Sequence, residues 1–399
     1  MRVLLLAAFS LTPIVATRAQ STWIVHPSGG GSFTQIAAAY DAASPGDTLL
    51  VHPGNYQGFV RYQAKGVRIL GLAAGVVVTS PIVLGNVPAG QQLALLHLTV
   101  DAANNPFDGP YPQFTALSVF NAPDVLLSDL VVRGPYMGSV CPCSGGTGVN
   151  LDNTTTVMSR VTAYGANGVG WTYGESGGPA VHALDSHLTL SACTLRAGNS
   201  GAGQLSSVQT SASLACLSST VVVDECTIQN GSPLGNGIGA YLGSDVLIAN
   251  HAGITQTVLR TTNGGAVQYQ GAVLQGIGSP SFPLTARPQP GLIGPATAMR
   301  GGQIDWTVHG DANETFVFGI SLGIVPTVMP GLFEGTVFTA LHPTSALGFA
   351  TTQPTGDAFL TLPVPNLPSL EGLQVFLQVG GWISQPIWKA SGVAVTTIR

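Results

Sequence analysis

Apolar positions recur about every 32 residues through the first two thirds of the chain. One series consists of Leu98, Leu130, Val161, Cys193 and Cys226. A second series precedes it at the same spacing and consists of Leu117, Val149, Val181 and Leu214. Two strand segments that advance with one period are typical of a solenoid, because each coil buries its apolar face by stacking on the next. The pattern therefore predicts a parallel β-helix.

Successive side chains of a strand point to opposite faces, so each repeat position can be assigned a direction. We expect the first series, numbered 0, and the positions two residues later to point inward. Positions −1, +1 and +3 are then expected on one outward sheet face. The −1 ladder is His97, Asp129, Arg160, Ala192 and Glu225; the +1 ladder is Thr99, Val131, Thr162, Thr194 and Thr227; the +3 ladder is Asp101, Arg133, Tyr164, Arg196 and Gln229.

Charged and aromatic groups are concentrated in these ladders, although charged residues make up only 8% of the chain. The pattern indicates a candidate site. Its catalytic candidates are Arg160, Arg196, Glu225 and Asp129, and its substrate-binding candidates include Asp101, Arg133 and Tyr164. The alternative is that neighbouring charges form exposed ion pairs and that Tyr164 packs beside arginines, since structural networks resemble active sites.

Four connections follow the +3 positions, at residues 102–116, 134–148, 165–180 and 197–213. The second carries Tyr136, and the third carries Trp171 and Tyr173. Aromatic loops on a rigid scaffold are typical of a sugar-binding wall, so these three side chains join the substrate-binding candidates. The alternative is that the rings pack back onto the solenoid.

The entrance to the solenoid is expected to be covered by a short helix. Ser32 and Gln35 have the spacing of a capping box, Ile36 to Ala43 follow helical periodicity, and Pro45-Gly46 ends the pattern. Such a helix would cover the open end of the first coil.

The run SGGGSFTQIAAAYDAASPGDTLLVHPGNY resembles the opening of secreted right-handed parallel β-helix proteins of the pectate-lyase-like superfamily. It is especially similar to pectin methylesterases and to bacterial β-helix proteins of unassigned function. The resemblance covers roughly residues 22–285 and implies the fold. The chain lacks the Gln-Asp pair of pectin methylesterases, the Asp-Asp and Gly-His-Gly motifs of polygalacturonases, and an Arg-rich pectate-lyase signature. No catalytic residue is therefore carried over.

The pattern changes after residue 278. A proline-rich stretch at 279–290 is expected to be a stiff linker. Short alternating segments then predict a small antiparallel β-sandwich over 291–399, which resembles a C-terminal surface or accessory module of bacterial exported proteins. The expected fold class is all-β, with a right-handed parallel β-helix over 20–278 followed by this sandwich.

Composition and the first residues bear on where the protein acts. Residues 1–19 have the pattern of a secretory signal peptide, with Arg2, an apolar core and the small residue Ala19. No later run is long and apolar enough to span a membrane. We therefore expect a secreted or cell-surface protein. The net charge of −5 and the lack of a basic patch argue against nucleic-acid binding.

The cysteines and the polar residues of the other strand series give weaker indications of a functional site. Five cysteines are present, and Cys193 and Cys226 are expected to stack as buried thiols, not as a disulfide. His182 and Asn150 are expected to point outward on the other strand series, with Asp152, Asp185 and His187 in the following turns. A second polar site is one interpretation of these residues, and solvated turn residues are the preferred one. No metal-binding spacing occurs, and no cofactor is expected.

These observations leave two hypotheses for function. In the first, the protein binds an extracellular polysaccharide or cell-surface glycan on one sheet face. If it also modifies the glycan, a lyase-like reaction would use Arg160 or Arg196 with Glu225 or Asp129 as the acid–base partner. In the second, it is a non-catalytic surface, adhesion or cell-envelope protein that uses the β-helix as a rigid rod.

Overall fold

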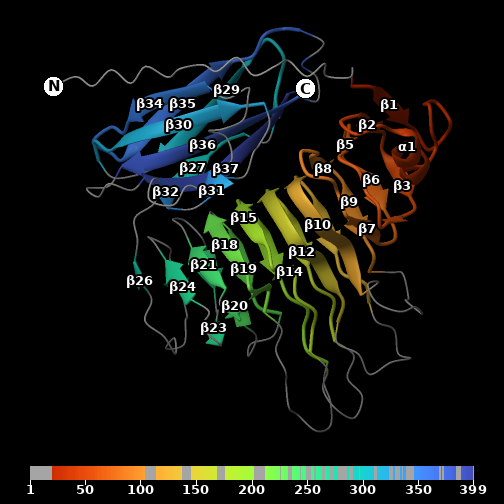
Figure 1. Ribbon diagram of the computed structural model, residues 1–399, viewed down its shortest axis with the longest axis horizontal. Helices are drawn as coiled ribbons and strands as arrows, with labels where there is room; N and C mark the ends of the chain where they lie inside the picture. Colours follow the sequence, from red (N-terminus) through yellow and green to blue (C-terminus); the bar gives the residue numbers. More distant parts are fainter. Residues whose placement is uncertain are drawn as a thin grey trace.

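The computed structural model is nearly all-β and consists of a parallel β-helix followed by a smaller, mainly antiparallel β-sandwich (Figure 1). The structure describes residues 20–398 except 104–113, 137–144, 169–175, 202–211, 225, 232–235 and short segments between 243 and 387. Residues 1–19, the expected signal peptide, lie outside the described part.

Each complete coil has three strand segments, which stack into three faces. The first face contains β4 (Val60–Arg61), β7 (Ile82–Gly85), the first halves of β10 (Thr115–Ser128) and β12 (Thr147–Ser159), β14 (Val181–Leu184), β17 (Leu214–Leu217), β20 (Asn236–Tyr241) and β23 (Val258–Thr262).

The second face follows along the chain. It contains β1 (Thr22–Val25), β2 (Thr48–Val51), β5 (Arg68–Gly71), β8 (Leu93–Leu96), the second halves of β10 and β12, β15 (His187–Ser191), β18 (Thr220–Asp224), β21 (Asp245–Ile248), β24 (Ala266–Tyr269) and β26 (Thr285–Ala286).

The third face completes the coil. It contains β3 (Gly54–Tyr56), β6 (Val76–Val78), β9 (Thr99–Asp101), β11 (Val131–Arg133), β13 (Thr162–Tyr164), β16 (Thr194–Arg196), β19 (Thr227–Gln229), β22 (Gly253–Thr255) and β25 (Leu274–Gln275).

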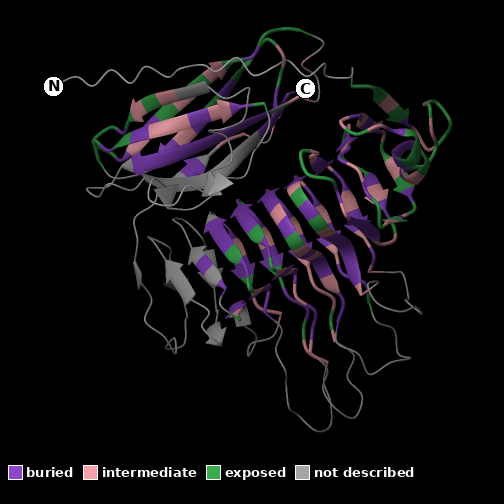
Figure 2. Ribbon diagram, viewed as in Figure 1, coloured by how far each residue is buried: buried purple, intermediate pink, exposed green. Residues whose placement is uncertain are grey.

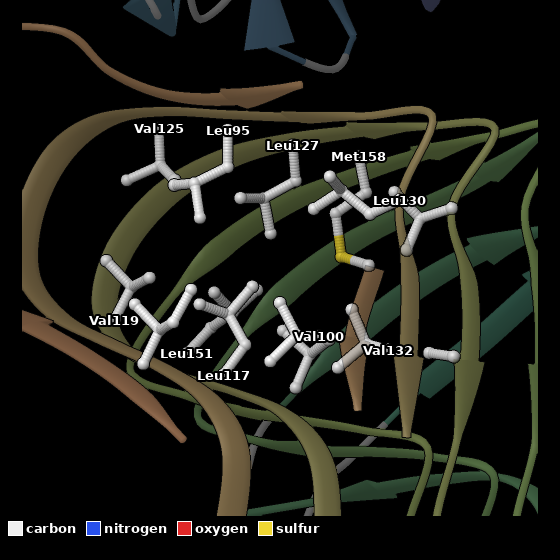
Figure 3. Packing of buried hydrophobic residues seen from close by; sticks show 14 of the residues in the cluster. Leu95, Val100, Leu117, Val119, Val125, Leu127, Leu130, Val132, Leu151 and Met158 are labelled. Atoms are coloured by element: carbon white, nitrogen blue, oxygen red, sulfur yellow. The ribbon is translucent and has the colours of Figure 1, made fainter. Parts of the chain in front are cut away.

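All three faces contribute to one apolar core. Leu130, Val161, Cys193 and Cys226 are at most 1% exposed, as the 32-residue period predicts. The second series is also buried and in register, with Leu117 beside Val149 and Val149 beside Val181. Figure 3 shows side chains from the three faces meeting inside the coil, and Figure 2 shows the buried positions along its length. Burying one such side chain contributes about 1.5–3 kcal/mol.

The entrance helix is present, but its expected cap is not. Helix α1 (Ile36–Ala42) buries Ile36, Ala39 and Tyr40 against the first coils. Its N-cap is Gln35, and no side chain caps it, so the predicted capping box is wrong. The Gln35 side chain instead accepts a hydrogen bond from the backbone of Gln57, 3.3 Å away, which ties the helix to the solenoid.

The sandwich is built from two sheets around a core that includes Trp306 and Phe316. The smaller sheet contains β27 (Gly291–Ile293), β29 (Gln303–His309) and β35 (Asp357–Pro363). The larger contains β28 (Thr297–Ala298), β37 (Trp388–Ile398), β36 (Gln374–Trp382), β30 (Thr315–Ser321) and β34 (Ala346–Thr351), with β32 (Phe333–Glu334) paired to β37. Strands β31 (Thr327–Val328) and β33 (Thr336–Val337) form a separate pair.

The sandwich is docked against the second face of the β-helix. Strand β37 lies beside β12, β15 and β18 (Figure 1). On β36, Val375, Leu377 and Val379 enter the sandwich core, while Phe376 points the other way. Phe376 is fully buried in a second apolar cluster with outward-facing residues of the β-helix, namely Leu70, Ala94, Leu96, Leu126 and Val157. Phe376 therefore contributes to the contact between the two parts.

The segment between the two parts is partly described. Strand β26 lies within the expected linker at 279–290 and pairs with β24, so it extends the second face of the β-helix. The domain boundary itself stays a prediction.

We expect Phe376→Ala to lower the free energy of unfolding by about 3–5 kcal/mol, because it leaves a cavity between the two parts. Urea denaturation followed by circular dichroism measures the change. Phe349→Ala is the matched control: Phe349 is 73% exposed, so its loss should change stability by no more than about 0.5 kcal/mol. A double-mutant cycle with Leu126→Ala should show coupling, and strictly additive effects would contradict the docked contact.

Candidate functional site

The +3 ladder forms a continuous row on the third face. Strands β9, β11, β13, β16 and β19 pair in parallel register, so that Asp101, Arg133, Tyr164, Arg196 and Gln229 follow one another from coil to coil. Neighbouring members are about 4.8 Å apart at the backbone. The +1 ladder runs beside it, and its four threonines and Val131 are half-buried.

The members of this row differ in how far they are already engaged. Arg133 lies 3.5 Å from Asp101, and its guanidinium is 5.7 Å from the centre of the Tyr164 ring. Arg196 is exposed, and within the described part of the chain no ion pair or hydrogen bond engages its side chain. The row thus presents the aromatic ring of Tyr164, followed by the uncommitted guanidinium of Arg196 and the amide of Gln229.

The −1 ladder does not share this face, so the prediction of three ladders on one sheet face is wrong. His97, Asp129, Arg160 and Ala192 adopt φ between 52° and 54° and form the corner between the second and third faces. A residue with positive φ interrupts the two-residue alternation of a strand, which redirects its side chain.

Asp129 and Arg160 form a paired group at this corner. The Arg160 Nε and Nη2 donate to the two Asp129 carboxylate oxygens at 2.8 and 3.0 Å. The Ser128 hydroxyl donates to Asp129 at 2.6 Å, and His97 Nδ1 lies 3.8 Å from the same carboxylate. The side chains of Asp129 and Arg160 are only 16% and 21% exposed. Their contacts with each other link adjacent coils.

The remaining candidates fall into two groups. Tyr136 follows β11 and is 48% exposed, so its ring is accessible. Trp171, Tyr173 and Glu225 lie outside the described residues.

Polar side chains of the first face are hydrogen-bonded from coil to coil. Asn150 donates to the Ser118 hydroxyl at 3.3 Å, and His182 Nδ1 lies 2.8 Å from Asn150 Oδ1. These three residues occupy one column in adjacent coils. Burial lowers the pKa of His182, which favours the neutral ring. The exact 32-residue spacing of Ser118, Asn150 and His182 was the signal that could have identified the column.

A second polar network joins three successive coils of the β-helix. Arg68 donates to Gln92, and Gln92 donates to Asp124, each at 3.3 Å. Burial raises the pKa of Asp124 to about 7, although Gln92 and Arg68 act in the opposite direction. Below about pH 7, the folded protein therefore favours the protonated form of the Asp124 carboxyl.

The described cysteines are buried and reduced. Cys193, Cys216 and Cys226 are free thiols, and the backbone N–H of Cys193 donates to the Cys226 sulfur at 3.3 Å. Cys141 and Cys143 lie outside the described residues. Among the residues that can be placed, no group of His, Cys, Asp and Glu is arranged to bind a metal, and no helix has the length and apolarity of a membrane span.

Comparisons with known proteins identify no relative. No protein-family model matches the chain, and no curated protein matches it. Among solved structures, one similar chain is the sporulation control protein Spo0M from Bacillus subtilis, at 17% identity and a TM-score of 0.18. The match covers 28% of this chain and 49% of Spo0M, so this chain spans about half of that protein. A likeness this low carries no argument about fold or function.

We expect Arg160→Ala to destabilise the protein by about 1–3 kcal/mol, because it leaves the largely buried Asp129 carboxylate without its main partner. Arg196→Ala removes an exposed cation and should leave stability nearly unchanged. Thermal and urea unfolding of both variants measure the difference. Equal stability of the two variants would show that the corner pair has no structural role.

Asp124→Asn should reduce the pH dependence of stability. Because the folded pKa lies above the unfolded value of about 3.9, the native state binds more protons between about pH 4 and 7. The wild-type contribution is therefore complete at low pH and is lost as pH rises through about 7. We expect the variant to be more stable than wild type at pH 8 but not at pH 4, as measured by urea denaturation. Parallel pH profiles would contradict the assignment.

Proposed function

We propose that this is an exported β-helix protein that binds an extracellular polysaccharide along its third face. The observation that carries the proposal is the in-register row in which Tyr164 and the uncommitted Arg196 follow one another on an accessible sheet. An aromatic ring can stack on the CH face of a sugar, while a guanidinium binds hydroxyl or carboxylate groups. The half-buried threonine column beside the row supplies further hydroxyl groups.

The repeat spacing suits an extended ligand better than a small one. Equivalent side chains recur at each coil, about 4.8 Å apart, so a polymer lying along the axis meets the same kind of group repeatedly. The resemblance of the entrance segment to secreted pectate-lyase-like β-helix proteins supports the same class of ligand, and the signal-like residues 1–19 support export.

Binding without catalysis is the better supported form of this proposal. An arginine that abstracts a proton needs a guanidinium that can approach the substrate, and the Arg160 guanidinium is already hydrogen-bonded to both carboxylate oxygens of Asp129. Arg196 lies on the third face, two coils beyond the corner that holds Asp129, which argues against their acting as an acid–base pair; its alternative partner, Glu225, lies outside the described residues. Tyr164, Arg196 and Gln229 therefore serve as contact residues.

The test is a pull-down of the mature protein on insoluble pectin, alginate, chitin and cellulose. We expect retention on at least one polymer, and about a tenfold loss of affinity for Arg196→Ala or Tyr164→Ala, the equivalent of about 1.4 kcal/mol for one lost contact. Arg61→Ala is the matched control, because Arg61 lies at β4 and pairs with Asp41. Equal retention of all four proteins would reject the third-face site and favour the structural rod.

A further inference from the structure

A ladder of asparagine amides runs along the corner between the first and second faces. Asn86, Asn121 and Asn153 each have φ between 49° and 57°, a conformation that asparagine tolerates well. Asn121 donates to Asn86 Oδ1 at 2.8 Å, and Asn153 donates to Asn121 Oδ1 at 2.9 Å. Every amide therefore donates toward the preceding coil, and its own oxygen faces the following coil.

The ladder ends where an aspartate takes the next position. Asp152 pairs with Leu184, so Asp185 occupies the corner one coil beyond Asn153, and its φ of 47° matches the others. A carboxylate has no N–H to donate, so Asn153 Oδ1 and the Asp185 carboxylate are successive acceptors without a donor between them. Within the described part of the chain, no hydrogen bond reaches either acceptor.

This end of the ladder opens into a surface cavity of about 390 Å³. Ligand sites typically begin at about 300 Å³. The lining mixes hydroxyl, amide and charged groups with small apolar surfaces, and consists of Val87, Ala89, Asn121, Ala122, Pro123, Asn153, Thr154, Thr155, Asp185 and His187. Asn153, Asp185 and His187 are exposed within it.

The surrounding charges favour a cation. Burial raises the pKa of the neighbouring Asp152, and the negative charge of Asp185 adds to that rise, while His182 opposes it. Burial in turn favours the neutral form of His182. Asp185 is the carboxylate in the lining of the cavity, and His187 also lines it.

We propose that this cavity binds an amino-sugar unit, whose ammonium group occupies the donor position between Asn153 Oδ1 and Asp185. An ammonium presents three N–H donors and a compact positive charge, which matches Asn153 Oδ1 and the anionic Asp185 carboxylate at successive corner positions of the same cavity lining. The hydroxyls of the sugar match Thr155 and the asparagine amides, and its CH surface matches Ala89 and Pro123. A lysine side chain would supply the ammonium but not the hydroxyl groups. This site is separate from the third face and does not depend on the function proposed for it.

Asp185→Asn is the decisive variant, because it removes the charge while completing the ladder. Its new amide can donate to Asn153 Oδ1, as the preceding amides do, and asparagine tolerates the left-handed backbone. We therefore expect a melting temperature at or above that of wild type, together with at least a tenfold loss of affinity.

Isothermal titration calorimetry on the mature protein uses three probes, a fully deacetylated glucosamine hexamer, its N-acetylated counterpart and hexalysine. We expect the deacetylated hexamer to bind, and the other two to bind at least tenfold more weakly. Added salt should weaken the deacetylated interaction, since it depends on charge. Asp305→Asn in the sandwich is the charge-matched control and should bind as wild type does.

Several results would overturn the proposal. They are no binding of the deacetylated hexamer, equal binding of the acetylated one, unchanged affinity of Asp185→Asn, or hexalysine binding as tightly as the sugar. Arg196→Ala should retain the amino-sugar interaction, so failure of the third-face site and failure of this cavity give different patterns.

Discussion

The β-helix depends on the parallel register that places each inward side chain over its equivalent in the next coil. Leu130, Val161 and Cys193 stack in this way, and the backbone hydrogen bonds of three faces hold the same alignment. A solenoid has few contacts between distant coils, so its stability is approximately the sum of these neighbouring interfaces. The polar ladders outside the core exist because the same register governs both sides of each strand.

The two-residue alternation of a strand predicts where side chains point within the strand, but it does not apply at the corners between strands. The 32-residue period predicted the inward columns and the third-face row correctly, because strands impose a strict two-residue alternation. It misplaced Asp129 and Arg160, because the spacing of residues along the chain does not reveal a left-handed backbone conformation. Arginine and alanine rarely adopt it, so Arg160 and Ala192 gave no local signal. The Asn121 and Asn153 corners were readable, because asparagine is enriched in that conformation.

The position of the sandwich on the second face could not be predicted from the sequence for a different reason. Val125, Leu126 and Leu127 form an uninterrupted apolar run, and such runs are typical of strands covered on both sides. The run therefore indicated that something covers the second face. It did not indicate what, because the covering residue, Phe376, lies some 250 positions later, and a non-local contact leaves no periodic trace.

The position of Phe376 limits how the number of coils in the β-helix can change. Repeat proteins commonly gain or lose whole units, because each unit contacts only its neighbours. Here Phe376 shares one buried apolar cluster with Leu70, Leu96, Leu126 and Val157, which belong to successive coils. Removing a coil from that stretch would preserve strand pairing but would alter the apolar surface against which the sandwich is docked. The coils beneath the sandwich are thus fixed in number, while those beyond it retain the modular freedom of a solenoid.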